Sequence, residues 1–244
     1  MPEYLFFTRW LNLIFGGLVT AVMQMLGLHP AHPGAPIDDR TALEILVTLG
    51  LIAFFVLVRL TISVEKPAPP QHLAEMIYEG IGGLAEQIIG HGYERFQAFV
   101  TCIFLFVLLN NLLGLIPGIP APTSAPMVTL GIAVPTFLYY NYQGLRAQGL
   151  VGYIKQFAGP IWWMAWLLLP IEIISHLARI MSLTIRLYAN MFASDMLTLG
   201  FFSLFPIGIP AIFLGLHVFV SVIQAFVFTL LAMIYLSLAV AHEH

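Results

Sequence analysis

The chain carries little charge and no run of one sign. Charged residues make up 9% of its 244 residues, and the formal net charge is −3, whereas a soluble domain has about 25% charged residues. The nine Lys and Arg residues are dispersed, so no basic stripe supports nucleic-acid binding. Hydrophobic residues make up 60% of the chain. This balance indicates a protein of the lipid bilayer, with room for about five to seven passes of ~20 residues each.

The sequence also lacks the usual signatures of cofactor and nucleotide sites. The single cysteine, Cys102, excludes an internal disulfide, and no Cys/His pairing has the spacing of a zinc site. No G-x-x-x-x-G-K-[ST] pattern occurs, so we expect no nucleotide chemistry and no enzyme activity from this chain by itself. We expect no metal and no cofactor. One alternative is a redox subunit with haem between His176 and His217, which would have to face each other. A stand-alone secondary transporter would show inverted repeats, and none is evident.

Residues 1–40 are predicted to form an N-terminal helix and a linker. The apolar stretch 11–28 resembles a signal peptide, but no small-x-small cleavage site follows cleanly. Polar or small residues recur on one helical face of this stretch: Arg9, Asn12, Gly16, Thr20 and Gln24. We therefore expect a retained helix lying in the membrane interface, with a further membrane-embedded element as the alternative. The Pro- and Gly-containing range 29–40 follows as the linker.

Residues 41–244 are predicted to form one all-α, polytopic membrane domain. Three ordinary spanning helices are expected over 41–63, 96–117 and 126–143. Between the first two, 71–90 has apolar positions at helical spacing but is too polar to span, which indicates an amphipathic helix on the membrane surface. Three acids on it, Glu75, Glu79 and Glu86, favour contact with another protein over attraction to anionic lipid.

Two C-terminal apolar runs are too long for an ordinary span. Residues 161–204 would extend about 66 Å as one helix and 207–241 about 52 Å, whereas the hydrocarbon core is ~30 Å thick. Pro170 and Pro210 could break them. Either each run is broken, or the two form a hairpin of long, steeply tilted helices. The row of polar residues described below favours the hairpin, because a nearly horizontal helix presents a long face to a partner.

The distribution of basic residues predicts the orientation. Arg59, Lys66 and Arg95 flank one connection, and Arg146 and Lys155 precede the long hairpin. These regions are expected on the cytoplasmic side. The loop 117–125 and the turn 205–210 lack basic residues and are expected outside.

A row of polar residues runs through the otherwise apolar range 160–206. Its members are spaced by three or four residues and therefore share one helical face: Glu172, Ser175, Arg179, Ser182, Arg186 and Asn190. A charged side chain at mid-membrane costs ~2.5–3.5 kcal/mol on insertion scales, so such residues persist where they perform a task. Arg186 is always protonated and cannot relay a proton. It can lower the pKa of a nearby carboxylic acid, strip its proton and block leakage between two half-pathways.

Asp195 and His217 are the candidate proton-handling residues. Both side chains titrate, and a facing pair can pass protons near neutral pH. Asp195 lies nine residues after Arg186, about 180° around a helix, so we expect it to serve a different compartment. We predict that Asp195 and His217 lie within direct or one-water reach. Gln224, seven residues after His217, shares its helical face, whereas His176 is interpreted as an interhelical hydrogen-bonding residue.

Three segments carry a resemblance to a known family. The run 182–193 contains Ser182, Arg186, Leu187, Asn190 and Met191 in the pattern Ser-x-x-x-Arg-Leu-x-x-Asn-Met, followed by an acid at Asp195. His217 with Gln224-Ala225-Phe226 fits His-x6-Gln-Ala-Phe, and 108–117 resembles the end of the second span. In order and spacing these segments resemble subunit a of F-type ATP synthases over roughly residues 40 to 241.

The resemblance implies a fold, a role and partners. It implies a stator in a bacterial inner membrane that offers two offset half-channels to the carboxylates of a rotating c-ring and couples proton flow to ATP synthesis. It assigns the separating arginine to Arg186 and the uptake side to Asp195, His217 and Gln224, with Asn190 one turn beyond the arginine. Glu172, Ser175, Arg179 and Ser182 are expected on the exit side. The implied partners are the c-ring, the b subunits of the peripheral stalk, protons and the bilayer.

Overall fold

The computed structural model describes residues 5–25, 27, 35–63, 67–116, 119–158, 165–204 and 209–240. All regular elements of these residues are helical, which confirms the all-α prediction. In chain order they are α1 (Phe6–Met25), α2 (Asp39–Thr61), α3 (Pro69–Ile89), α4 (Glu94–Leu112), the short 3₁₀ helices η1 (Leu113–Leu115) and η2 (Pro122–Ser124), α5 (Pro126–Ala158), α6 (Ala165–Leu204) and α7 (Ile209–Val240).

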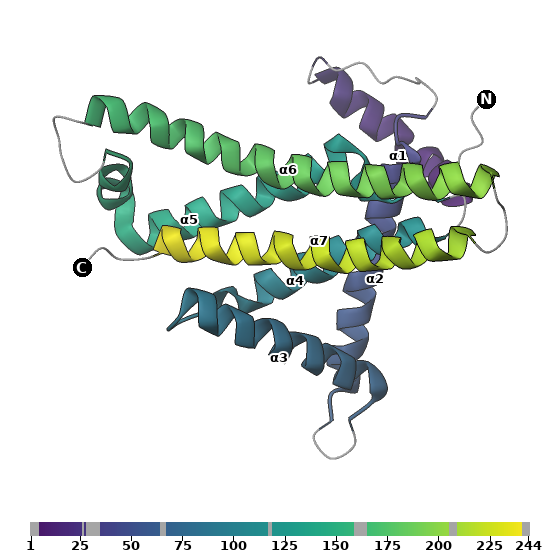
Figure 1. The fold of residues 1–244 in the computed structure, drawn as a ribbon, viewed down its shortest axis with the longest axis horizontal. Helices are drawn as coiled ribbons and strands as arrows, with labels where there is room; N and C mark the ends of the chain where they lie inside the picture. Colours follow the sequence, from purple (N-terminus) through teal and green to yellow (C-terminus); the bar gives the residue numbers. More distant parts are fainter. Residues whose placement is uncertain are drawn as a thin grey trace.

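The two long C-terminal runs form an antiparallel hairpin of unbroken helices. α6 has 40 residues and α7 has 32, about 60 Å and 48 Å at 1.5 Å per residue. Pro170 lies inside α6 without ending it, so the interpretation in which each run is broken is wrong for the described residues. α6 and α7 lie side by side along the longest dimension of the molecule, and α2 runs across their direction (Figure 1). If α2 crosses the bilayer, the hairpin is steeply tilted within it.

Within the described residues, five helical segments are long and apolar enough to cross a membrane: Phe6–Met25, Asp39–Thr61, Glu94–Leu115, Trp166–Ser203 and Ala211–Val240. The predicted third span differs from the structure. Its segment begins α5 at Pro126, but the helix continues to Ala158, and α5 is not one of the five. The polar segment from Arg146 therefore continues the helix instead of ending it. A kink at Gly149, where φ is 73°, redirects the chain in a conformation that glycine adopts without steric cost.

α3 matches the predicted surface helix in position and character. Its apolar residues Ile81 and Ala85 are buried in a cluster with Val100 of α4 and Met233 of α7. The acids Glu75, Glu79 and Glu86 are exposed on the other side of the helix. α3 thus rests on the bundle and leaves a charged surface free.

α1 is attached to the rest of the bundle through one narrow face. Thr8, Leu11 and Gly16 are buried. Asn12 donates through its amide nitrogen to the carbonyl of Ile37 and accepts from the Ile37 N–H, both at 3.0 Å. Most of the remaining surface of α1 is exposed and apolar, which suits contact with lipid.

The main core lies among α4, α5, α6 and α7. Leu183, Leu187 and Met191 of α6 pack in one cluster with Ala225 and Phe228 of α7. This packing fixes the rotation of α6 and so decides which of its polar residues remain outside. Some predicted positions lie outside the described residues: Lys66, the linker residues 29–34, the loop residues 117–118, the residues 161–164 at the start of the first long run, the turn residues 205–208 and the tail 241–244.

Candidate functional site

The polar row of α6 lies on a face that the rest of the chain leaves open. Ser182, Arg186 and Asn190 are exposed, and Glu172, Ser175 and Arg179 are half-buried. The reason is the rotation of α6, because Leu183, Leu187 and Met191 occupy the core side. The guanidinium nitrogen Nη2 of Arg186 lies 3.4 Å from Ser182 Oγ. The predicted shared face is thus a surface of the folded chain.

The two arginines of the row have different surroundings. Arg179 lies 3.6 Å from the carboxylate of Glu172, and its guanidinium carbon is 5.4 Å from the centre of the Tyr235 ring on α7. For Arg186, the described part of the chain places no carboxylate within the 4.0 Å of an ion pair. Arg179 is therefore partly neutralised within the chain, whereas Arg186 presents its charge outward.

Asp195 and His217 meet across the hairpin on the opposite side of α6. His217 is fully buried and Asp195 is nearly so. Nδ1 of His217 lies 3.7 Å from Oδ1 of Asp195, which confirms the predicted proximity of the two side chains. The other carboxylate oxygen, Oδ2, accepts a hydrogen bond of 3.2 Å from the backbone N–H of Ala121.

Several polar partners of this pair have no separate signal in the sequence. Ser194 Oγ lies 2.8 Å from His217 Nδ1, and the backbone carbonyl of Asn111 lies 3.1 Å from His217 Nε2. The Asn111 side chain donates to the carbonyl of Ser221 at 3.2 Å and accepts from the Thr123 hydroxyl at 2.6 Å. Asn111 belongs to the recognisable segment 108–117, but its contact with the histidine depends on how α4 and α7 pack. The Asn111 side chain is thus held from two sides, by Ser221 and by Thr123.

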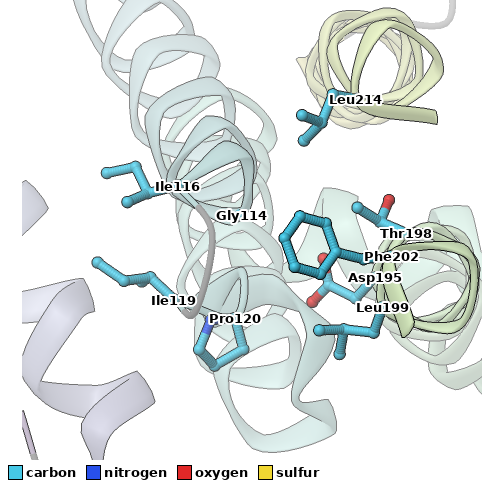
Figure 2. Close-up of a pocket in the computed structure, with 9 residues that line it drawn as sticks. All are labelled: Gly114, Ile116, Ile119, Pro120, Asp195, Thr198, Leu199, Phe202 and Leu214. Carbon is cyan, nitrogen blue, oxygen red and sulfur yellow. The ribbon is translucent and has the colours of Figure 1, made fainter. Parts of the chain in front are cut away.

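A cavity of about 430 Å³ lies beside Asp195. Figure 2 shows Asp195, Thr198, Leu199 and Phe202 on α6 facing Leu214 of α7 and the residues Gly114, Ile116, Ile119 and Pro120. Asp195 is the one ionisable residue among the described residues that line the cavity, and the other cavity walls are mainly apolar. His217 is not among the described lining residues, so Asp195 is in contact with both the cavity and the histidine.

Gln224 and Asn190 do not join the Asp195–His217 cluster. Ser194 is opposite His217 in the antiparallel hairpin. Gln224 is seven residues after His217, about 10 Å further along α7, and is therefore level with Leu187 on α6. Gln224 is half-buried, and Asn190 is exposed on the row. The two amide side chains thus lie nearer the level of Arg186 than the level of Asp195.

The alternative of haem held between two histidines is wrong. His217 is hydrogen-bonded to Ser194 on α6. His176 lies 18 residues before Ser194 on the same helix, which is about 27 Å along its axis. His176 packs instead against the rings of Phe137 and Tyr140 on α5. Elsewhere in the described residues, no three His, Cys, Asp or Glu side chains come together as a metal site.

Comparison with known proteins agrees with the motifs. A family model described as the ATP synthase A chain matches residues 42–237. The ATP synthase subunit a of Koribacter versatilis is 51% identical over 244 residues, the whole of both chains. The subunit a of Solibacter usitatus is 43% identical over 229 residues, which cover 93% of this chain and 97% of that protein. The subunit a of Bdellovibrio bacteriovorus is 44% identical over 171 residues, which cover 70% of this chain and 74% of that protein.

These relatives are bacterial, and the part of this chain that the structure describes has five helical segments apolar enough to cross a membrane. The chain is a multi-pass protein of the bacterial inner membrane. Since the family model covers most of the length and the first relative matches from end to end, the chain belongs to the family of ATP synthase subunit a.

Proposed function

We propose that this chain is the proton-translocating stator of an F-type ATP synthase, with two offset half-channels separated by Arg186. Membership of the subunit a family supports proton transport within the membrane sector of the synthase. The remaining details rest on the side chains. ATP chemistry is assigned to other subunits, because the sequence carries no phosphate-binding loop.

The exposure of Arg186 carries this proposal. A permanently charged guanidinium on a membrane helix is stable only beside an opposite charge, a polar group or water. In the described residues Arg186 contacts the neutral hydroxyl of Ser182, and the acid of the chain nearest along α6, Asp195, is buried on the opposite side. A carboxylate on a second protein satisfies this charge. We assign that carboxylate to the rotating c-ring.

The cavity and the Asp195–His217 pair form the uptake half-channel in this proposal. They lie at the end of the hairpin that the distribution of basic residues assigns to the outside. A proton arriving through the cavity meets Asp195 first, because His217 is fully buried behind it. Transfer to Nδ1 of His217 then moves the proton into the interior of the hairpin.

The exit half-channel is assigned to the other end of the polar row. Glu172, Ser175, Arg179 and Ser182 extend from Arg186 toward the N-terminus of α6. Arg179 and Glu172, which lie 3.6 Å apart, place a positive and a negative group next to each other along this assigned exit path. Asn190 and Gln224 lie near the level of Arg186, where amide groups can hold water or a ring carboxylate without adding charge.

Coupling follows from the energy of moving a charge in the membrane potential. One proton crossing 100 mV releases about 2.3 kcal/mol. A ring carboxylate can approach Arg186 while ionised, but it must be protonated before it turns toward lipid, because burying an unpaired carboxylate is costly. Protonation on one side and release on the other therefore bias rotation. The b subunits of the peripheral stalk would hold this chain stationary.

Cysteine cross-linking tests the placement of the row against the rotor. Ser182→Cys and Asn190→Cys should each cross-link to a cysteine placed beside the ring carboxylate in the assembled synthase. Met181→Cys and Leu177→Cys are matched controls, since these residues are 59% and 56% exposed but lie on other sides of α6. Thr184 is unsuitable as a control for access, because it is only 9% exposed. Equal cross-linking at the control positions, or none at the row, would contradict the proposal.

A further inference from the structure

Ser194 has a defined contact that the proposed function does not use. Its hydroxyl is buried and lies 2.8 Å from Nδ1 of His217. The Asp195 carboxylate is farther from the same nitrogen, at 3.7 Å. The atom that would exchange a proton with Asp195 is therefore already hydrogen-bonded to a neighbouring serine.

The partners of the ring determine its neutral tautomer. Nε2 faces the backbone carbonyl of Asn111 at 3.1 Å, and a carbonyl oxygen only accepts hydrogen bonds. Nε2 therefore carries the hydrogen in neutral His217, and Nδ1 is an acceptor. The Ser194 hydroxyl, which can donate or accept, is then the donor to Nδ1.

The Asn111 side of the ring is rigid, so the proton-exchanging atom is Nδ1. The Asn111 side chain is tied to Ser221 and Thr123. Gly114 packs so closely that a Cβ added there would lie 2.9 Å from Nε2. Nε2 has no room for another partner, whereas Nδ1 lies between two oxygen atoms that can adapt to the addition of a proton.

We infer that Ser194 is a positioning residue of the proton relay: while the Asn111 carbonyl holds Nε2–H, the Ser194 hydroxyl holds Nδ1 as an acceptor directed toward Asp195. When protonated Asp195 transfers its proton, the carboxyl O–H bond breaks and an Nδ1–H bond forms. The Ser194 hydroxyl then rotates from donor to acceptor, and Asp195 remains as a carboxylate beside the imidazolium. The serine is unchanged overall. This inference rests on the proposed function, because it requires that protons pass through His217.

The test measures proton flux through assembled synthase in inverted membrane vesicles. Ser194→Ala should reduce flux about fivefold, the scale of one neutral hydrogen bond, and Ser194→Thr should restore most of it by keeping the hydroxyl. Thr229→Val is the matched control, since among the described residues the buried Thr229 hydroxyl bonds the Ala225 carbonyl of its own helix and no other group. The control should run at the wild-type rate.

A second measurement separates positioning from packing. The ¹⁵N spectrum of histidine-labelled synthase, assigned to His217 by difference from His217→Ala, should show the pure Nε2–H tautomer in the wild type. In Ser194→Ala the ring should stay in the Nε2–H tautomer, which the Asn111 carbonyl holds, but the Nδ1 signal should move to that of an acceptor that has lost its hydrogen bond. An unchanged His217 signal in Ser194→Ala would overturn the inference, whatever the flux.

The outcomes distinguish this inference from the proposed function. If His217→Ala is slow while Ser194→Ala matches the wild type, the serine inference fails and the relay stands. If His217→Ala itself transports protons at the wild-type rate, the relay fails and the serine inference fails with it.

Discussion

Arg186 and Asp195, nine residues apart on α6, point to opposite sides of the same helix. Arg186 is exposed on the polar row, and Asp195 is buried against Ala121 and His217. One helix therefore separates a permanent positive charge from a titratable acid. This separation allows a proton path on one side and a rotor contact on the other without a direct ion pair that would quench both.

Asp195 and His217 are predicted to act as one unit. Asp195→Asn and His217→Ala should each slow proton flux in vesicles, because either change breaks the transfer at the 3.7 Å contact. The double mutant should lose less than the sum of the two effects, since residues in contact are not additive. Additive losses, measured as logarithms of the flux, would show two independent sites.

Gly114 is predicted to be required for the position of His217. A Cβ at this position would lie 2.9 Å from the ring and from the Ala121 side chain, so the fully buried ring would have to move. Gly114→Ala should therefore reduce proton flux as strongly as His217→Ala. Gly131→Ala on α5 is the matched control, because a Cβ there meets nothing within 4 Å. Normal flux in Gly114→Ala would show that the ring position does not matter.

The sequence predicted much of the fold and half of the site. Helical spacing was sufficient for α3 and for the shared face of the row from Glu172 to Asn190. The length of the two apolar runs, together with that row, favoured the long hairpin over two broken runs. The partners Ser194, Asn111 and Ala121 could not be predicted, because these contacts join residues 23, 106 and 74 positions apart. The end of the third span was misjudged because Arg146 looked like a polar boundary, while the chain turns only at Gly149.

The contact of α3 with α4 gives a prediction about stability. A Cβ at Gly82 would collide with the Gln97 side chain, whose Nε2 donates a 2.8 Å hydrogen bond to the Tyr78 carbonyl. Gly82→Ala should lower the free energy of unfolding by about 1 kcal/mol through loss of this bond. Gly83→Ala, one residue away and free of contacts within 4 Å, should not destabilise the protein. Thermal inactivation of the purified complex measures both, and equal midpoints would contradict the prediction.

Arg179→Ala is predicted to be milder than Arg186→Lys. Arg179 is paired with Glu172 and lies near the Tyr235 ring, so in the proposed mechanism it supplies only a local positive field on the exit side and does not separate the half-channels. Arg186→Lys keeps the charge but loses the planar fork of five donors, which a carboxylate recognises. ATP-driven proton pumping should be reduced in the first variant and nearly absent in the second. The reverse order would assign the separating role to Arg179.

The most direct test of the central claim is proton-driven ATP synthesis by Arg186→Ala in inverted vesicles. The variant should assemble with the rotor, because the Arg186 side chain is exposed and supports no core contact. It should make no ATP under an imposed proton gradient, since ring carboxylates would pass between the two half-channels without discharging their protons. ATP synthesis at the wild-type rate in an assembled Arg186→Ala complex would contradict the account.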